Sequence, residues 1–548
     1  ISNAIYTMSI EEMIKAVEPD NTFRTGKEWA GVWTRDISYS IILSMAHLQP
    51  AVAMKSLLQK VNRKKRIVQD TGTGGAYPAS TDRMIWAVAA WEVYKATGNR
   101  GWLLQAYEII KNSIEDDEKN IYDQTTGLVK GESSFLDWRE QTYPKWMQPA
   151  DIFESECLGT NAVHFQANKV LSEMAGVLHY DRVAGKHAAL AEKIKNGINQ
   201  YLWLPEKNYY AQYRYGRNYK IVSPRAEALG EALCVLFGIA DDERAKKIIA
   251  STPVTPYGIT CIHPQIPNIP PYHNNAVWPF VQTYWALASA KAGNLSSVAE
   301  SIFSIYRPAA LFLTNKENFV AENGDYAGTQ INSSNMLWSL SGNIGLIHKI
   351  IFGIRFEKDK LVFKPSIPRS LQGKHVLSNF KYRDANLFIS ISGYGNRIKK
   401  YLIDGELQSK AELGTTLTGA HTIEIVLADN ESIEKTVHKV PVYTTLPTPT
   451  VTLADNLLTW NNIEGAIAYE IFKNGVSADK IKNTHYQITS SGYAEFQVVA
   501  VDKNKEASFA SEPVSIMNEK NTTVYQMESK HEKSALPYNG FTGNGFVE

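Results

Sequence analysis

The stretch KGESSFLDWREQTYPKWM, residues 130–147, places acidic side chains among large aromatic rings. Its carboxyl groups belong to Glu132, Asp137 and Glu140, and Pro144 excludes one uninterrupted helix, so we expect a loop. Aromatic walls exclude water and thereby raise the pKa of a carboxyl group, which can then serve as a general acid toward a leaving-group oxygen. Asp137 is our candidate for this acid, with Glu132 and Glu140 binding sugar or facing solvent. The structural alternative is that Asp137 caps a helix beginning at the next residue.

A second segment, GKEWAGVWTRDISYS, brings two tryptophans and an Arg-Asp pair to the predicted start of a helix. Arg35 and Asp36 could orient a ligand, with Trp29 and Trp33 as platforms for sugar rings. The alternative is that the aspartate caps the helix and forms an ordinary ion pair with its neighbour.

A third segment, PPYHNNAVWPFVQTYW, sets polar donors beside an aromatic ring ahead of an apolar helix. Tyr272, His273, Asn274 and Trp278 are suited to sugar hydroxyl groups, since such sites combine apolar surface with a few polar groups. An ordinary loop with Asn275 as the helix cap explains the same residues.

The fourth segment, ENFVAENGDYAGTQINSSNMLWSLSG, carries Glu317, Glu322 and Asp325 before the last predicted helix. One of these carboxylates could activate a water as general base. The ENGD run alternatively forms a turn with charged edges, because Asn-Gly favours turns. The segment by itself leaves the base open among the three.

The elements that must position these loops are helices up to about residue 353, with apolar residues at helical spacing. Two joints are alike, YKATGNRGWLLQAYEII and SAKAGNLSSVAESIFSI: in both, a glycine is placed to end one helix and an asparagine to cap the next. About twelve helices in six such hairpins predict an (α/α)6 toroid over residues 1–353, because one hairpin cannot bury its apolar face alone.

The pattern after residue 353 changes to alternating, β-branched segments that predict strands. We expect a small antiparallel β-domain over residues 354–440. A Pro/Thr-rich linker then opens a β-sandwich over residues 441–516, which resembles a fibronectin type III module with Trp460, Tyr469 and Tyr493 at core-like positions. Residues 517–548 resemble a truncated carbohydrate-binding module or form a tail. The fold class predicted is therefore mainly α, with two appended β units.

Composition narrows the function. A net charge of +1 over 548 residues gives no reason to expect nucleic acid as a partner, and no stretch approaches the 18 apolar residues of a membrane span. Three cysteines match neither a disulfide framework nor a zinc motif. The chain starts at Ile without a signal sequence, so either a signal peptide has been removed or the chain is part of a longer protein.

The four segments in this order resemble the six-hairpin glycosidases, closest to glycoside hydrolase family 63, trehalase and the α-1,6-glucosidase part of glycogen debranching enzymes. WTRD looks like the Trp-x-Arg-Asp motif of the debranching group, and ESSFLDW is similar to the segment whose aspartate is the acid, which corresponds to Asp137. The helix start ECLGTNAVHFQANK implies that Asn161 is a site residue. YHNNAVWPFV departs from the related loop, since Ala276 follows Asn275 where a glycine is usual.

ENGDYAGTQINSSNMLWS resembles the segment that bears the base in family 63, and counting back from Trp338 favours Glu322, with Asp325 as the alternative base. The resemblance thus implies an inverting glycosidase for an α-glucosidic or related α-glycosidic bond, Asp137 protonating the leaving oxygen and Glu322 activating the water. The expected substrate-binding residues are Trp33, Arg35, Asp36, Trp138, Asn161, Tyr272, His273 and Trp278.

No metal or cofactor is required by this chemistry. Family 63 members can hold a structural calcium, but no compact oxygen-rich ligand run is evident. The partner expected is an oligosaccharide or polysaccharide, and the modular organisation resembles secreted bacterial carbohydrate enzymes, periplasmic or extracellular. Three alternatives remain open: a phosphorylase, a uronic-acid lyase or epimerase that uses His273 with Tyr272, and a non-catalytic carbohydrate-binding protein of a glycan-uptake system.

Overall fold

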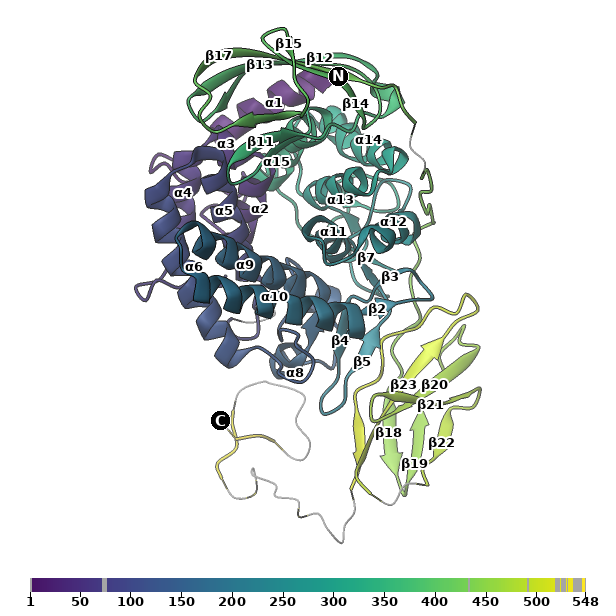
Figure 1. Ribbon diagram of the computed structural model, residues 1–548. Coiled ribbons are helices and arrows are strands. Elements are labelled where there is room, and N and C mark those ends of the chain that lie inside the picture. The colour runs from purple at the N-terminus through teal and green to yellow at the C-terminus, as the bar shows by residue number, and fades with distance from the viewer. Residues whose placement is uncertain are drawn as a thin grey trace.

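The computed structural model describes residues 2–70, 76–431, 434–489 and 492–517, with 523, 529, 531–535 and 545–547 of the C-terminal region. Within this part of the chain, twelve helices of seven residues or more surround a common axis (Figure 1). The inner ring is α2 (Thr34–Ser40), α5 (Ile85–Thr97), α9 (Leu158–Val177), α11 (Ala228–Phe237), α13 (Pro279–Ala292) and α15 (Leu337–Gly345). The outer ring is α1 (Ser2–Lys15), α4 (Pro50–Gln59), α6 (Arg100–Asn120), α10 (Asp181–Tyr201), α12 (Asp242–Ser251) and α14 (Leu295–Phe312).

Each inner helix packs against the next one along the chain, and α15 returns to pack against α2, which closes the ring. The first helix of the chain is the outer partner of the last, because α1 packs against α15 rather than α2. The two ends of the helical region therefore hold each other, and the predicted toroid is present.

The two similar joints have the predicted structure. Gly98 and Gly293 end α5 and α13 in the left-handed conformation, with φ of 69° and 79°. The side chains of Asn99 and Asn294 then accept hydrogen bonds from backbone N–H groups of the next helices. In both hairpins, local sequence thus sets where one helix ends and the next begins.

Short elements lie in and near the loops of the toroid. They are α3 (Ala46–Leu48), α7 (Arg139–Thr142), α8 (Pro149–Glu154), β1 (Glu156–Cys157), β2 (Trp203–Leu204), β3 (Tyr209–Tyr210), β4 (Tyr213–Tyr215), β5 (Ile221–Ser223), β6 (Ala226–Glu227), β7 (Ile262–His263), β8 (Ala276–Val277) and β9 (Phe319–Val320).

The first β unit covers one side of the toroid, over α1, α3 and α15 in Figure 1. Its strands are β10 (Ile354–Phe356), β11 (Lys360–Phe363), β12 (Gly373–Tyr382), β13 (Ala385–Gly393), β14 (Ile398–Ile403), β15 (Glu406–Leu407), β16 (Glu412–Gly414) and β17 (Gly419–Leu427). The expectation of a purely antiparallel unit is wrong, because β13 and β17 pair in parallel within the five-stranded sheet. The chain between them is long enough for the crossover that a parallel pair needs.

One hydrophobic core runs from the helices into this β unit, including Phe356, Leu361 and Ile423 alongside the buried faces of the helices. The predicted division at residue 353 therefore marks a change of secondary structure and not an interruption of the core. The sandwich differs: Trp460 and Tyr469 belong to a second, separate core.

The sandwich pairs a three-stranded sheet with a four-stranded one, and all its strand pairs are antiparallel. Its strands are β18 (Val451–Ala454), β19 (Leu457–Trp460), β20 (Ala468–Lys473), β21 (Val476–Ile481), β22 (His485–Gln487), β23 (Ala494–Val501) and β24 (Val514–Ile516). Tyr493, expected in the core, is instead 45% exposed, and its hydroxyl accepts a hydrogen bond from Asn218 of the toroid at 2.6 Å. The likeness to a fibronectin module and the domain limits stay predictions, and most of the 517–548 tail lies outside the described residues.

The sandwich is also joined to the loop of residues 130–147. Trp146 Nε1 donates to the carbonyl oxygen of Ala510 at 2.9 Å, and Arg225 lies over the ring of Phe509. All three cysteines are buried and free. In the described part of the chain, no helix is both long and apolar enough to cross a membrane.

Candidate active site

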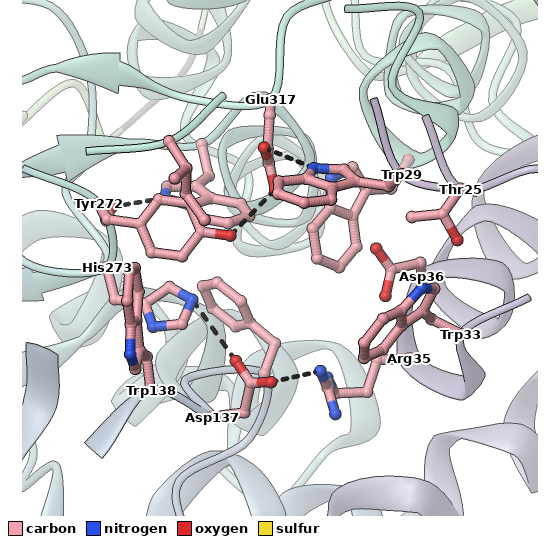
Figure 2. A pocket seen from close by; sticks show the side chains of 14 residues that line it. Thr25, Trp29, Trp33, Arg35, Asp36, Asp137, Trp138, Tyr272, His273 and Glu317 are labelled. Carbon is pink, nitrogen blue, oxygen red and sulfur yellow. Dashed lines mark hydrogen bonds and ion pairs between the residues drawn. The ribbon is translucent and has the colours of Figure 1, made fainter. Parts of the chain in front are cut away.

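A cavity of about 460 Å³ opens at the N-terminal ends of three inner helices, α2, α13 and α15. The loop before α7 and the long connection between α14 and α15 complete its walls. The lining residues are Thr25, Trp29, Trp33, Arg35, Asp36, Phe135, Asp137, Trp138, Tyr272, His273, Trp278, Glu317, Ile331 and Trp338. Three carboxyl groups thus face a cavity walled largely by aromatic rings (Figure 2).

Asp137 lies on one wall beside Arg35, whose Nη2 donates to Asp137 Oδ2 at 2.7 Å. His273 Nε2 is 3.9 Å from the other carboxylate oxygen. Asp82 stands on the far side of the arginine, its Oδ2 3.7 Å from Arg35 Nε. The N-cap residue of α7 is Trp138, which makes no side-chain capping hydrogen bond, so Asp137 lies one residue before the cap position.

Glu317 lies on the opposite wall, across the cavity from Asp137 (Figure 2). Its side chain is nearly fully buried and accepts two hydrogen bonds, from Trp29 Nε1 to Oε2 at 3.0 Å and from the Tyr272 hydroxyl to Oε1 at 3.1 Å. The donors therefore hold both oxygens of one carboxylate in a fixed orientation.

The structure does not bring Glu322, the base predicted from the sequence, to the cavity. The Glu322 side chain is exposed and accepts a hydrogen bond from Asn275 Nδ2 at 2.7 Å, and Asp325 accepts one from the backbone N–H of Ala327. Neither residue lines the cavity. The strand β9, which pairs with β8, separates the two glutamates. Glu317 precedes β9 and reaches the cavity, whereas Glu322 belongs to the ENGD turn that follows β9 and lies outside the cavity.

Asn161 is also not in the site. Its fully buried amide binds the backbone N–H and C=O of Val129 at 2.7 and 2.9 Å and the carbonyl oxygen of Cys157 at 2.8 Å. Asn161, which the family resemblance implied to be a site residue, therefore supports the backbone of the loop that precedes Asp137.

The other predicted site residues reach the cavity together: Trp33, Arg35, Asp36, Asp137, Trp138, Tyr272, His273 and Trp278. Sequence reasoning placed Glu317 among three candidates without selecting it, and did not assign Thr25, Phe135, Ile331 or Trp338 to the site. Trp338 could have been assigned to the site from its position. It lies at the N-terminal end of an inner helix, as Trp33 and Trp278 do.

Burial sets the charges of this pocket. It raises the pKa of Glu317 to about 7, against the two hydrogen bonds that favour the ionised form, and it raises the pKa of Asp36 well above its usual value. Burial lowers the pKa of His273 to about 4, so this imidazole is neutral at pH 7. Glu317 can thus gain or lose a proton near neutral pH.

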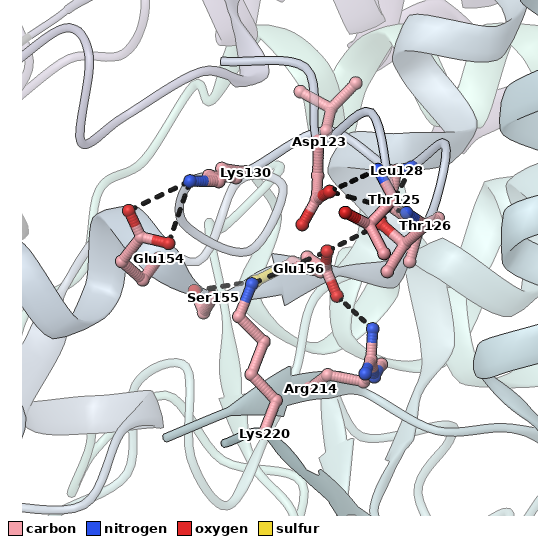
Figure 3. A network of polar contacts seen from close by, with 12 residues as sticks. Asp123, Thr125, Thr126, Leu128, Lys130, Glu154, Ser155, Glu156, Arg214 and Lys220 are labelled. Carbon is pink, nitrogen blue, oxygen red and sulfur yellow. Dashed lines mark hydrogen bonds and ion pairs between the residues drawn. The ribbon is translucent and has the colours of Figure 1, made fainter. Parts of the chain in front are cut away.

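A buried polar network fixes the start of the Asp137 loop (Figure 3). Glu156 is fully buried; it accepts from Thr126 Oγ1 at 2.8 Å, pairs with Arg214 and lies 3.5 Å from Lys220 Nζ. Glu156 also forms a β-bridge with Gly131. Charged partners of Glu156 therefore anchor the backbone at Gly131, six residues before Asp137.

The loop is held further along by two hydrogen bonds. The Ser133 backbone N–H donates to the Tyr143 hydroxyl at 2.7 Å, and the Thr160 hydroxyl donates to the carbonyl oxygen of Glu132 at 2.6 Å. Glu132 itself is fully buried and binds the Ser80 hydroxyl, so it is neither a sugar ligand nor solvent-facing. In the described residues, no group of three or more His, Cys, Asp or Glu side chains could hold a metal ion.

A six-hairpin toroid with paired carboxyl groups in an aromatic pocket is the arrangement of a glycoside hydrolase. The chain belongs to the family of the mannosylglycerate hydrolase MGH1-like glycoside hydrolase domain, whose model matches residues 30–339. This range includes every lining residue of the cavity except Thr25 and Trp29. No curated protein sequence matches the chain.

Solved structures share the fold at low identity. A family 78 rhamnosidase of Bacillus sp. GL1 matches with 18% identity and a TM-score of 0.51, over 81% of this chain and 43% of that one. A sialidase matches with 16% identity and a TM-score of 0.56, over 74% of this chain and 39% of that one. The family 63 mannosylglycerate hydrolase of Thermus thermophilus, in complex with Tris and D-glycerate, matches with 14% identity and a TM-score of 0.49, over 62% of this chain and 99% of that one.

Proposed function

We propose that the protein hydrolyses an α-glycosidic bond with inversion, using Asp137 as general acid and Glu317 as general base. The observation that carries the proposal is that these two carboxyl groups face each other from opposite walls of one aromatic pocket. Inversion needs room for a water between the sugar and the base, with carboxyl groups roughly 6.5–9.5 Å apart.

Asp137 suits the acid role because it is the more accessible carboxyl, with 20% of its side chain exposed. Arg35 stabilises the carboxylate that remains once the proton has passed to the glycosidic oxygen. Its guanidinium is shared with Asp82, so its charge does not act on Asp137 alone.

Glu317 suits the base role because Trp29 and Tyr272 both donate to it. Two donors on two oxygens favour the ionised form, and a carboxylate so oriented can accept the proton of one positioned water. Its pKa of about 7 makes it a stronger base than an ordinary glutamate, so it takes that proton more readily.

The substrate is proposed to be a glycan end or a small α-glycoside, with glucose and mannose as the first sugars to test. The remaining lining residues, Asp36, Trp33 and Trp338 among them, offer hydrogen bonds and ring faces to a single sugar. No metal or cofactor takes part in the steps proposed.

Proton NMR of the first-formed sugar, on aryl α-glucosides and α-mannosides, tests the reaction. We expect release of the sugar as the β-anomer, which then mutarotates. Release as the α-anomer would indicate retention and carboxyl groups about 5–5.5 Å apart, and would reject the mechanism. Binding of glycosides without cleavage of any would favour the non-catalytic carbohydrate-binding alternative.

A further inference from the structure

The β-sandwich reaches the loop of Asp137 through one phenylalanine. Phe509 lies on the segment that connects β23 with β24, and backbone hydrogen bonds of Ser508 and Ser511 hold this segment to β23. The Phe509 ring is buried in the core of the toroid instead of the core of the sandwich. We propose that Phe509 is a positioning residue, which holds the loop of Asp137 in place through two stacked tyrosines. The inference rests on the proposed function and concerns a part of the chain outside residues 30–339, the range that the family model matches.

Three aromatic rings form a continuous stack from the sandwich to the loop. Phe509 stacks on Tyr213 of β4, with ring centroids 6.4 Å apart and 16° between the ring planes. Tyr213 stacks in turn on Tyr143, with centroids 5.1 Å apart and 23° between the planes. All three side chains are buried, and rings in a closely packed interior have little room to shift independently. A displacement of Phe509 is therefore passed on to Tyr143.

The hydroxyl groups of both tyrosines bind the backbone on either side of Asp137. The Tyr143 hydroxyl accepts a hydrogen bond from the Ser133 backbone N–H at 2.7 Å, and the Tyr213 hydroxyl donates one to the carbonyl oxygen of Thr142 at 3.0 Å. Asp137 lies four residues after the first of these contacts and five residues before the second. The stack thus fixes both ends of the stretch that carries the proposed acid.

Neighbouring contacts fix Phe509 itself against the toroid. The guanidinium carbon of Arg225 lies 3.9 Å from the centroid of the Phe509 ring. The next residue, Ala510, is bound through both of its backbone groups: its N–H donates to the Tyr215 hydroxyl at 2.8 Å, and its carbonyl oxygen accepts from Trp146 Nε1 at 2.9 Å. Because misplacing a reacting group by about 1 Å can lower a rate by about 10²-fold, a small shift of this stack is enough to affect catalysis.

The wall of Glu317 is held by other segments. Glu317 precedes β9, and its hydrogen-bond donors Trp29 and Tyr272 come from the loops before α2 and α13. Loss of the ring at position 509 should therefore impair protonation of the leaving group more than it impairs the attack of water.

A comparison of two leaving groups tests the inference. Phe509→Leu removes the ring and keeps an apolar side chain, and Phe496→Leu makes the same change at a similarly buried ring in the sandwich's own core. We expect Phe509→Leu to lower kcat on alkyl α-glycosides about tenfold or more, while kcat on the α-glycosyl fluoride stays within about threefold of the wild type. In Phe496→Leu the ratio of the two kcat values should be that of the wild type.

Two outcomes of this comparison would overturn the inference. Equal losses on both substrates in Phe509→Leu would mean that the ring only stabilises the fold. The same change of ratio in Phe496→Leu would mean that any loosening of the sandwich has this effect.

Tyr213→Phe decides if Phe509→Leu does not fold, because it keeps the stacked ring and removes only the hydrogen bond to Thr142. Its kcat on alkyl α-glycosides should fall several-fold, with hydrolysis of the fluoride little changed. Unchanged kcat on both substrates would then reject the inference.

Amide hydrogen exchange tests the positioning without catalysis, so it also decides if the wild type cleaves no glycoside and the proposed function fails. Exchange of residues 131–143 should be faster in Phe509→Leu than in the wild type and in Phe496→Leu, whereas residues 315–321 around Glu317 should exchange alike in all three. Unchanged exchange of residues 131–143 in Phe509→Leu would overturn the inference, and so would faster exchange of both segments, which would indicate a general loosening.

Discussion

The two walls of the pocket hold the same functional group in two different environments. Asp137 is partly exposed and sits in a charged row with Arg35 and Asp82, whereas Glu317 is buried and is bound by two uncharged donors, Trp29 and Tyr272. Carboxyl groups acquire different roles when their surroundings stabilise different protonation states. The comparison teaches that charge controls the surroundings of Asp137, the proposed acid, and that burial and hydrogen bonds control those of Glu317, the proposed base.

The largest expected effect separates the two roles. Asp137→Asn and Glu317→Gln should each lower kcat on alkyl α-glycosides by about 10²–10⁴-fold, as expected for loss of a general acid or base. On the α-glycosyl fluoride, whose leaving group needs no proton, Asp137→Asn should retain most of its activity and Glu317→Gln should not.

Glu322→Gln is the matched control for the base, since it makes the same change five residues further on in an exposed side chain. Its kcat should stay within about twofold of the wild type. If Glu317→Gln keeps its activity on the fluoride while Asp137→Asn loses it, the two roles are reversed. A large loss of kcat in Glu322→Gln would indicate that Glu322, in the ENGD turn, is the base after all.

A smaller effect is expected from the charged row. Asp82→Asn removes the carboxylate that shares Arg35, so the guanidinium acts on Asp137 alone and favours its ionised form, which has no proton to donate. We expect kcat on alkyl glycosides to fall about tenfold, with hydrolysis of the fluoride little changed. Equal losses on both substrates would mean that Asp82 maintains the shape of the site instead; thermal unfolding of the variant would then show a matching decrease in Tm.

The smallest effect concerns the pH profile. Glu317 must be ionised to act as base, so kcat/KM should rise with pH through a pKa near 7. Trp29→Phe removes a hydrogen-bond donor to the ionised Glu317, which raises the pKa of this carboxyl group. The acidic limb of the kcat/KM profile should therefore move to higher pH by about half to one pH unit. Activity at pH 6 should fall several-fold, and activity at pH 9 should hardly change.

Trp33→Phe is the control for this profile. It changes another tryptophan of the same pocket, one for which no hydrogen bond to Glu317 is seen. Its acidic limb should coincide with that of the wild type even if its KM changes. An acidic limb unmoved in Trp29→Phe would assign the titration to another group, such as Asp36, whose pKa burial also raises.

That the loop of Asp137 reaches the pocket could be predicted from the sequence because its signal is local. Aromatic neighbours, Pro144 and the absence of helical spacing all lie within the loop itself, and the same holds for the Gly-Asn joints of the hairpins. The base could not be chosen in this way. Glu317 and Glu322 differ in their relation to β9, and the pairing of β9 with β8 joins residues more than forty positions apart.

Sequence alone determined the helical toroid, the change to strands after residue 353 and most of the residues that meet in the pocket, because periodicity, capping and local composition are properties of short segments. Tertiary structure decided which glutamate faces Asp137, that Asn161 supports backbone, that β13 and β17 run parallel, and that one core continues into the first β unit. These features depend on contacts between distant segments, and the free energy of burying a side chain is settled only when all its neighbours are in place.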